Sequence, residues 1–148
     1  MLRASKPWLS VILWMGFIFT MSTDLGSFDH TSRLLGPLLR WLLPHASPDT
    51  IGLLQHLLRK AGHFSEYAIL ALLLLRALES TLRPGTHGYK ALGLALLIAA
   101  AYAATDEFHQ SFVPGRTASV GDVLIDLTGA FSALGGAAVW RRGRSHSG

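Results

Sequence analysis

The chain has 148 residues, of which 50% are hydrophobic and only 15% are charged, whereas charged residues make up about 25% of an average soluble domain. This composition argues against a water-soluble fold. The formal net charge of +4 is spread over termini and loops, so the chain lacks the clustered basic face of a nucleic-acid binder. The absence of cysteine excludes disulfides, zinc–cysteine sites, iron–sulfur clusters and thiol nucleophiles.

The hydropathy pattern predicts one all-α membrane domain over residues 1–148, with four transmembrane helices. A span needs about 20 mainly apolar residues. The expected spans lie near residues 8–23, 62–79, 89–108 and 120–140. The first, WLSVILWMGFIFTM, follows Arg3 and Lys6 as a signal peptide would. No Ala-x-Ala cleavage site follows it, which favours a retained anchor helix.

Two shorter apolar segments, LLGPLLRWLL and IGLLQHLLRK, lie between the first and second spans. They are too short to cross a bilayer and are predicted to be interfacial helices, with Trp41 in the headgroup zone. A turn is expected at Pro84 and Gly85, before the third span.

Small residues at every fourth position predict that the third and fourth spans pack together, because they let helix backbones approach closely in lipid. These residues are Ala91, Ala95, Ala99 and Ala103 in the third span and Gly129, Ala133 and Ala137 in the fourth.

The distribution of basic residues predicts that both termini are cytoplasmic. Cytoplasmic segments carry an excess of Lys and Arg. With an inside N-terminus, the inner segments hold 8 such residues and the outer segments hold 5.

Polar side chains gather at the predicted outer ends of three spans, where ionisable groups are costly and indicate a functional site. On each span some of these residues share one helical face, and Arg116 follows a turn at Pro114–Gly115. The shared faces are Arg59, His63, Glu66 and Leu70 on the second span, Asp106, His109 and Gln110 on the third, and Ser119, Asp122 and Asp126 on the fourth. The candidate ligand-binding residues are Arg59, Lys60, His63, Glu66, Tyr67, Asp106, Glu107, Gln110, Arg116, Ser119, Asp122 and Asp126.

The predicted site has several chemical interpretations. A structural ion-pair network would pin three helices together, although apolar packing could replace it at little loss. His63 with Glu66, Asp106, His109 and Asp122 has metal-ligand side chains, but no recognised metal spacing occurs, so no metal or other cofactor is predicted. Proton exchange or hydrogen bonding is the preferred role of His63. The remaining histidines are predicted to be solvated: His30, His45, His56, His87 and His146.

Arg116 is expected to matter more to function than to folding. Its planar guanidinium could hold carboxylates on either side, or pair with one and bind an anionic group of a ligand. The alternative is a structural counter-charge to the acidic cluster.

The segments RKAGHFSEY and TDEFHQSFVPGRTASVGDVLIDLTGAFSALGG resemble the VanZ-like family of bacterial membrane proteins. The resemblance covers about residues 50–140 and includes Lys60-x-x-His63-x-x-Glu66-Tyr67, Asp106-Glu107-x-x-Gln110 and Pro114-Gly115-Arg116. It implies a small multi-pass helical protein of the bacterial inner membrane. It also implies a link to low-level resistance to teicoplanin and related glycopeptide or lipopeptide antibiotics, without a defined reaction.

Three functions remain open from the sequence. The site could bind an envelope lipid, a lipid-linked cell-wall precursor or an amphiphilic antibiotic. It could instead catalyse hydrolysis or transfer on a lipid headgroup, with candidate catalytic residues His63, Glu66, Asp106, Glu107 and Asp122. No nucleophile signature or phosphate-binding motif supports catalysis. The third possibility is a structural or assembly factor without a ligand. Membrane lipids are the expected partners and nucleic acid is not.

Overall fold

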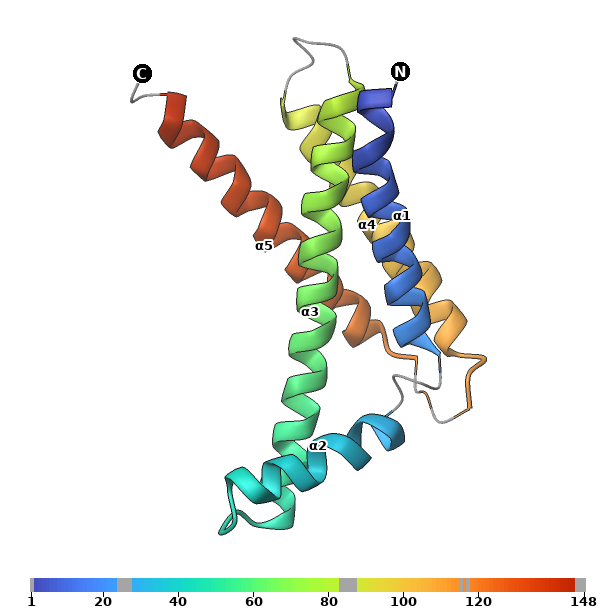
Figure 1. Cartoon of the computed structure of the whole chain (residues 1–148), viewed down its shortest axis with the longest axis vertical. Helices are drawn as coiled ribbons and strands as arrows, with labels where there is room; N and C mark the ends of the chain where they lie inside the picture. Colours follow the sequence, from blue (N-terminus) through green and yellow to red (C-terminus); the bar gives the residue numbers. More distant parts are fainter. Residues whose placement is uncertain (1, 24–27, 83–87, 115, 117, 146–148) are drawn as a thin grey trace.

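The computed structural model describes residues 2–23, 28–82, 88–114, 116 and 118–145, and these form five α-helices and no strand. The helices are α1 (Leu2–Ser22), α2 (Phe28–Leu42), α3 (Pro48–Thr81), α4 (Gly88–Gln110) and α5 (Val120–Ser145). Figure 1 shows α1, α3 and α4 running side by side, α5 crossing α3 at an angle, and α2 lying against the lower part of α3. The all-α class predicted from the sequence is confirmed.

Among the described residues, three helices are long and apolar enough to cross a membrane, namely α3, α4 and α5. The first predicted span, which corresponds to α1, is not one of them. Its apolar stretch from Trp8 to Met21 has 14 residues and extends about 21 Å at a rise of 1.5 Å per residue, less than the roughly 30 Å of a hydrocarbon core. The crossing by α1 therefore stays a prediction.

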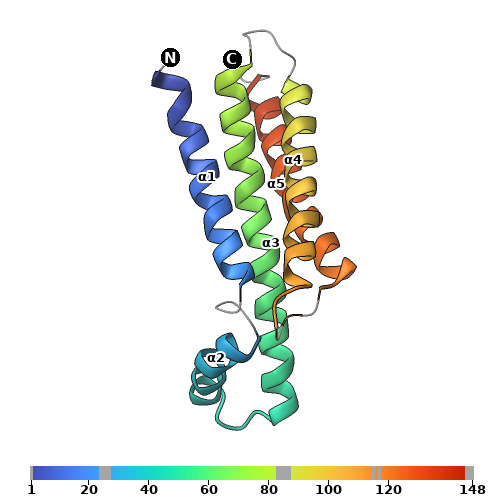
Figure 2. The same cartoon turned by 90° about the vertical axis from the view of Figure 1, so that its right-hand side faces the viewer.

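Helix α1 nevertheless packs along the bundle, as Figure 2 shows. It begins at Leu2, so that Pro7 falls inside the helix. Hydrogen bonds attach it at successive levels: Trp8 Nε1 donates to Thr81 Oγ1 (2.9 Å), Trp14 Nε1 donates to the Glu66 carbonyl (2.9 Å), and Tyr102 OH donates to the Met15 carbonyl (2.7 Å).

Helix α3 is longer than predicted, because it begins at Pro48 and continues without a break to Thr81. The prediction of a separate interfacial helix over residues 51–60 is therefore wrong, because these residues form part of α3. Ser47 caps the start, accepting a hydrogen bond from the Thr50 backbone N–H at 3.2 Å, and Pro48 is accommodated in the first turn. No further proline interrupts the helix. Its 34 residues extend about 51 Å, so α3 projects beyond the other spans toward α2.

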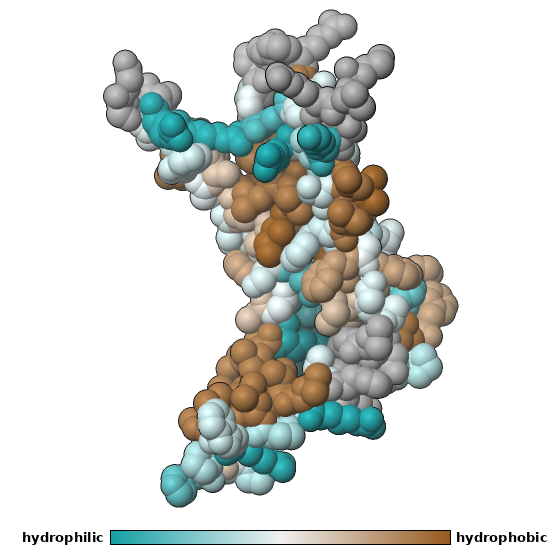
Figure 3. Space-filling view, in the orientation of Figure 1, coloured by the Kyte–Doolittle hydropathy of each residue, from teal (hydrophilic) through white to brown (hydrophobic). Residues whose placement is uncertain are grey.

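Helix α2 is the short helix predicted before the second span, and it is not a candidate span. It is amphipathic, with Leu39 buried while Leu34 and Trp41 are 78% and 77% exposed. Figure 3 shows apolar surface over this helix, below a recess of hydrophilic surface next to the bundle. An exposed apolar face of this kind is typical of an interfacial helix.

The alanines predicted to face a neighbouring helix are buried, each at most 2% exposed: Ala91, Ala95, Ala99 and Ala103. The predicted contact between α4 and α5 is present, but α5 packs more extensively against α3. Gly129 of α5 faces the Phe64 backbone of α3. The small residues on α5 therefore permit a close approach to α3 as well as to α4.

Helices α3 and α5 run in the same direction and meet at successive levels (Figure 1). Lys60 pairs with Asp122, His63 contacts Asp126, and Phe64 lies against Gly129. This parallel crossing carries the polar residues of both helices into one region. The predicted turn at Pro84–Gly85, as well as Gly115 and His87, lies outside the described residues.

Candidate functional site

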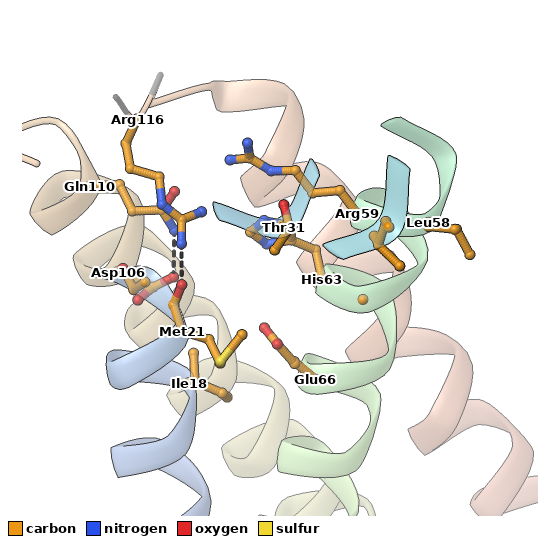
Figure 4. Close-up of a pocket in the computed structure, with 13 residues that line it drawn as sticks. Ile18, Met21, Thr31, Leu58, Arg59, His63, Glu66, Asp106, Gln110 and Arg116 are labelled. Carbon is orange, nitrogen blue, oxygen red and sulfur yellow. Dashed lines mark hydrogen bonds between the residues drawn. The ribbon is translucent and has the colours of Figure 1, made fainter. Parts of the chain in front are cut away.

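A cavity of about 190 Å³ opens at the α2 end of the bundle. Helices α1 to α4 line it together with Arg116, which lies between α4 and α5. Figure 4 shows its polar side chains facing one another, with Arg59 extending toward Arg116 and with His63 and Glu66 opposite Asp106. These side chains, with Gln110, are the predicted site residues that line the cavity.

The other wall of the cavity is apolar and comes from residues that the sequence did not single out. Ile18 and Met21 of α1 and Leu35 of α2 contribute to it. Thr31 and Ser22 add hydroxyl groups. The sequence carried no signal for these residues, because each is an ordinary member of an apolar or amphipathic helix.

Asp106 and Gln110 form a polar pair at the end of α4. The Gln110 side-chain amide donates to Asp106 Oδ2 at 3.0 Å, and both residues are at most 5% exposed. Asp106 Oδ1 and Gln110 Oε1 have no hydrogen-bond partner among the described residues. These acceptor atoms are therefore available to a ligand that donates hydrogen bonds.

Glu107 lies on a different face of α4 and contacts the start of α5. The Ser119 backbone N–H donates to Glu107 Oε2 at 2.8 Å. Ser119 contacts Glu107 through its main chain, while its side-chain hydroxyl accepts a hydrogen bond from the Gly121 backbone N–H at 3.1 Å. Neither Glu107 nor Ser119 lines the cavity.

Among the described residues, three ion-pair contacts join α3 to α5. One of them, between Glu79 and Arg141, lies toward the C-terminal ends of both helices, and the other two lie near the cavity. Lys60 Nζ lies 3.3 Å from Asp122 Oδ1, and His63 Nδ1 lies 3.3 Å from Asp126 Oδ1. The Lys60–Asp122 pair is partly exposed, whereas the side chains of His63 and Asp126 are 9% and 0% exposed. Asp122, expected beside Glu66 and Asp106, is instead held at the α3–α5 contact and does not line the cavity.

Among the described residues, Arg116 forms no ion pair with the acidic ends of α4 and α5, which was one of the arrangements considered from the sequence. Its guanidinium donates from Nε and Nη2 to the Thr23 carbonyl at 3.3 and 3.0 Å, and from Nη2 to the Met21 carbonyl. The backbone N–H of Arg116 donates to the Val113 carbonyl at 3.1 Å, which closes a turn. The carbonyl groups at the end of α1 compete with the carboxylates for the Arg116 guanidinium. They do so successfully because they lack intrahelical partners and carry the negative end of the α1 dipole.

The charge environment of Arg116 suits an anion. Burial lowers the pKa of its guanidinium, and the positive charge of Arg59 lowers it further, while Asp106 and Glu107 act in the opposite direction. The group nevertheless remains protonated, as arginine does throughout proteins. Two guanidinium groups therefore share one cavity.

Two other polar residues lie away from the cavity. Tyr67 is 1% exposed, its hydroxyl has no hydrogen-bond partner among the described residues, and its ring lies 6.3 Å from that of Tyr102. His109 turns toward α1, where its ring lies 4.6 Å from Phe19.

Of the histidines predicted to be solvated, His45 and His56 are exposed. The His30 side chain, His87 and His146 lie outside what the structure describes.

Comparison with known proteins identifies the family of the chain but provides no relative of known structure. No curated protein and no solved structure matches the chain. The VanZ/LLP1 family matches residues 7–141, which include α1 from Pro7 onward, the cavity and the polar contacts between α3 and α5 near it. Because the match extends over nearly the whole chain, this membrane protein belongs to the VanZ/LLP1 family.

Proposed function

We propose that the cavity binds the phosphate-bearing headgroup of an anionic envelope lipid or of a lipid-linked cell-wall precursor. The observation that carries this proposal is the presence of Arg59 and Arg116 at one cavity with an apolar wall. Neighbouring guanidinium groups repel each other, and a phosphate between them would relieve the repulsion through charge-assisted hydrogen bonds. The apolar wall would accept the first carbons of the lipid chains.

The opposite side of the cavity complements this role. Asp106 and Gln110 each have an acceptor oxygen that finds no hydrogen-bond partner among the described residues. Such acceptors suit the hydroxyl groups of a sugar or of glycerol. Glu66 lines the same space. An anion thus binds on the arginine side and hydroxyl or amine donors bind on the carboxylate side.

The size of the cavity favours a headgroup over a whole glycopeptide or lipopeptide antibiotic. Its volume is about 190 Å³, below the roughly 300–1,000 Å³ of pockets for drug-sized ligands. In this proposal, any effect on antibiotic resistance follows from the bound envelope lipid. The protein resides in the bacterial inner membrane, with the cavity at the outer face and both termini in the cytoplasm.

The test is lipid binding to the purified full chain in detergent, measured by native mass spectrometry. The probes are phosphatidylglycerol, zwitterionic phosphatidylcholine and an isoprenyl diphosphate. Arg59→Gln is the informative variant, because Arg116 also holds α1. We expect it to weaken binding of the anionic probes by about tenfold or more, since a hydrogen bond to a charged group contributes about 1.5–3 kcal/mol.

Arg40→Gln is the matched control, because Arg40 is an exposed arginine of α2 that does not line the cavity. Equal weakening by both variants, or equal binding of the anionic and zwitterionic probes, contradicts the proposal. Preference for the isoprenyl diphosphate over phosphatidylglycerol identifies a lipid-linked precursor as the ligand class. Release of a free headgroup from any probe would assign hydrolysis to the site.

A further inference from the structure

Three buried side chains next to the cavity place metal-ligating atoms close together. His63 of α3, Glu107 of α4 and Asp126 of α5 each offer one ligand atom that lies within 4.8 Å of the other two. The three residues are 8%, 5% and 0% exposed. They come from three different helices, so the spacing in the sequence gave no metal motif.

Several ligand-type atoms of these three side chains lack a hydrogen-bond partner among the described residues. His63 Nδ1, Glu107 Oε1 and both carboxylate oxygens of Asp126 have no hydrogen-bond partner among the described residues. Buried polar groups are nearly always satisfied, and a missing ligand or ion is one reason for an exception. The contact between His63 Nδ1 and Asp126 Oδ1 is 3.3 Å long. Two ligands of one tetrahedral zinc ion lie about 3.4 Å apart, because each is about 2.1 Å from the metal.

We propose that His63, Glu107 and Asp126 bind a divalent transition metal ion, with Zn²⁺ as the ion of best fit. A neutral imidazole with two carboxylates gives a ligand charge that one divalent cation balances. The imidazole favours zinc-like ions over Mg²⁺ or Ca²⁺, which prefer oxygen ligands alone. Three protein ligands leave a fourth zinc position open to water or a ligand.

The surroundings of the cluster support a metal site. The Ser119 backbone N–H fixes Glu107 through Oε2 and leaves Oε1 for the ion, which is the kind of outer-shell hydrogen bond that orients metal ligands. Lys60 is paired with Asp122, so its ammonium is directed to a different carboxylate. His63 also lines the cavity, which gives the ion a path from outside.

A shared proton is the competing arrangement. A proton between His63 and Asp126 would satisfy that pair and leave Glu107 Oε1 unpartnered, whereas a metal ion engages all three residues. Metal binding is measured without any lipid. A chain that binds no metal is therefore a separate result from a chain that binds no lipid headgroup.

The experiment uses the full chain, purified in detergent with any affinity tag removed, stripped with EDTA and reloaded with Zn²⁺. Metal content after desalting is measured by plasma mass spectrometry, with Mg²⁺ as the comparison ion. We expect about one Zn²⁺ per chain and no retained Mg²⁺. Co²⁺ substitution is expected to give the visible absorption of a site with nitrogen and oxygen ligands.

Glu107→Gln and Asp126→Asn are the test variants, because each retains the shape of the side chain and removes the charge. Each is expected to weaken Zn²⁺ binding by more than about tenfold, since even the outer-shell partners of metal ligands contribute about 10- to 100-fold. His56→Gln and Asp49→Asn are the matched controls, because both residues are exposed on α3. Circular dichroism and size-exclusion chromatography check that each variant folds.

Two outcomes overturn the proposal. One is a folded wild-type chain that retains no Zn²⁺, which assigns a shared proton to His63 and Asp126. The other is unchanged Zn²⁺ affinity in both test variants. If a variant fails to fold, the zinc-loaded wild type is examined by X-ray absorption instead. The proposed site requires one imidazole ligand in the zinc coordination shell. A coordination shell without an imidazole overturns the assignment.

Discussion

Gly129 of α5 lies directly against the backbone carbonyl of Phe64 of α3, so closely that a Cβ atom at Gly129 would collide with the carbonyl oxygen. His63 and Asp126 lie within one helical turn of this contact and meet at 3.3 Å. The absence of a side chain at Gly129 therefore determines how near α3 and α5 approach and allows their buried polar groups to meet.

Replacement of Gly129 by alanine is expected to destabilise the bundle. The added methyl group meets backbone, which cannot rotate away, and overpacking of this kind costs about 1–3 kcal/mol. Gly136→Ala is the matched control, because no atom lies within 4 Å of a Cβ there, and the better helix propensity of alanine favours stabilisation by up to about 1 kcal/mol. Thermal unfolding in detergent measures both. Equal melting temperatures for Gly129→Ala and the wild type would contradict the close-contact role.

The sequence predicted much of this architecture because its signals are local. Long apolar runs identified the three spans, and the four-residue period of alanines identified the buried face of α4. The start of the second span was misplaced, because the polar residues around Arg59 and Lys60 interrupt the hydropathy pattern. They do not interrupt the helix, since the backbone from Pro48 to Thr81 contains no proline after the first turn.

The candidate site was predictable only in part. Ionisable residues at the ends of three spans indicated where they converge, and the structure brings His63, Glu66 and Asp106 to one cavity. Which carboxylate each cation meets depends on helix rotation and crossing angle, and the sequence period does not determine these. Asp126 therefore contacts His63 where the prediction placed Asp122, and the carbonyls of α1 hold Arg116.

Replacement of Arg116 by lysine is expected to loosen the end of α1. The guanidinium donates to the carbonyls of Met21 and Thr23 together, whereas the compact ammonium of lysine, on a flexible aliphatic stem, cannot reproduce this planar fork. We expect a loss of about 1–3 kcal/mol, the usual contribution of hydrogen bonds to charged groups. Chemical unfolding in detergent measures it, with Arg33→Lys on exposed α2 surface as the control.

This substitution also tests the sequence-based view that Arg116 acts mainly on a ligand. A variant that unfolds like the wild type but loses binding of anionic lipid would support that view. Lost stability with unchanged lipid binding would assign Arg116 a structural role alone.

Replacement of Tyr102 by phenylalanine is expected to weaken the attachment of α1 to α4. The hydroxyl donates to the Met15 carbonyl at 2.7 Å, and its removal costs about 0.5–1.5 kcal/mol. Tyr67→Phe provides the comparison, because the Tyr67 hydroxyl has no hydrogen-bond partner among the described residues and its removal is expected to be neutral or stabilising. Proteolysis near the N-terminus reports release of α1. Equal protection in both variants would contradict the assigned hydrogen bond.

The orientation in the membrane can be tested with single cysteines, because the described chain contains none. His45 is exposed in the connection between α2 and α3, and Gly88 is exposed at the start of α4, at the opposite end of the bundle (Figure 1). With 8 basic residues on the predicted inner side and 5 on the outer side, the positive-inside tendency places Gly88 in the cytoplasm. An impermeant thiol reagent should label His45→Cys in intact cells and Gly88→Cys only after permeabilisation. The reverse pattern would place the cavity at the cytoplasmic face.

The same reagent decides whether α1 is a fourth span. Lys6 is exposed near the start of α1, at the Gly88 end of the bundle, and α1 contacts α3 from Trp8 to Trp14. If α1 crosses the membrane with α3, Lys6→Cys lies on the cytoplasmic side and is labelled only after permeabilisation, like Gly88→Cys. Tilting, local thinning of the bilayer and the flanking basic residues would compensate for its short apolar stretch at modest cost. In the contrary outcome, the reagent labels Lys6→Cys in intact cells but does not label Gly88→Cys in intact cells. This result would exclude a crossing by α1 and reduce the membrane domain to three spans.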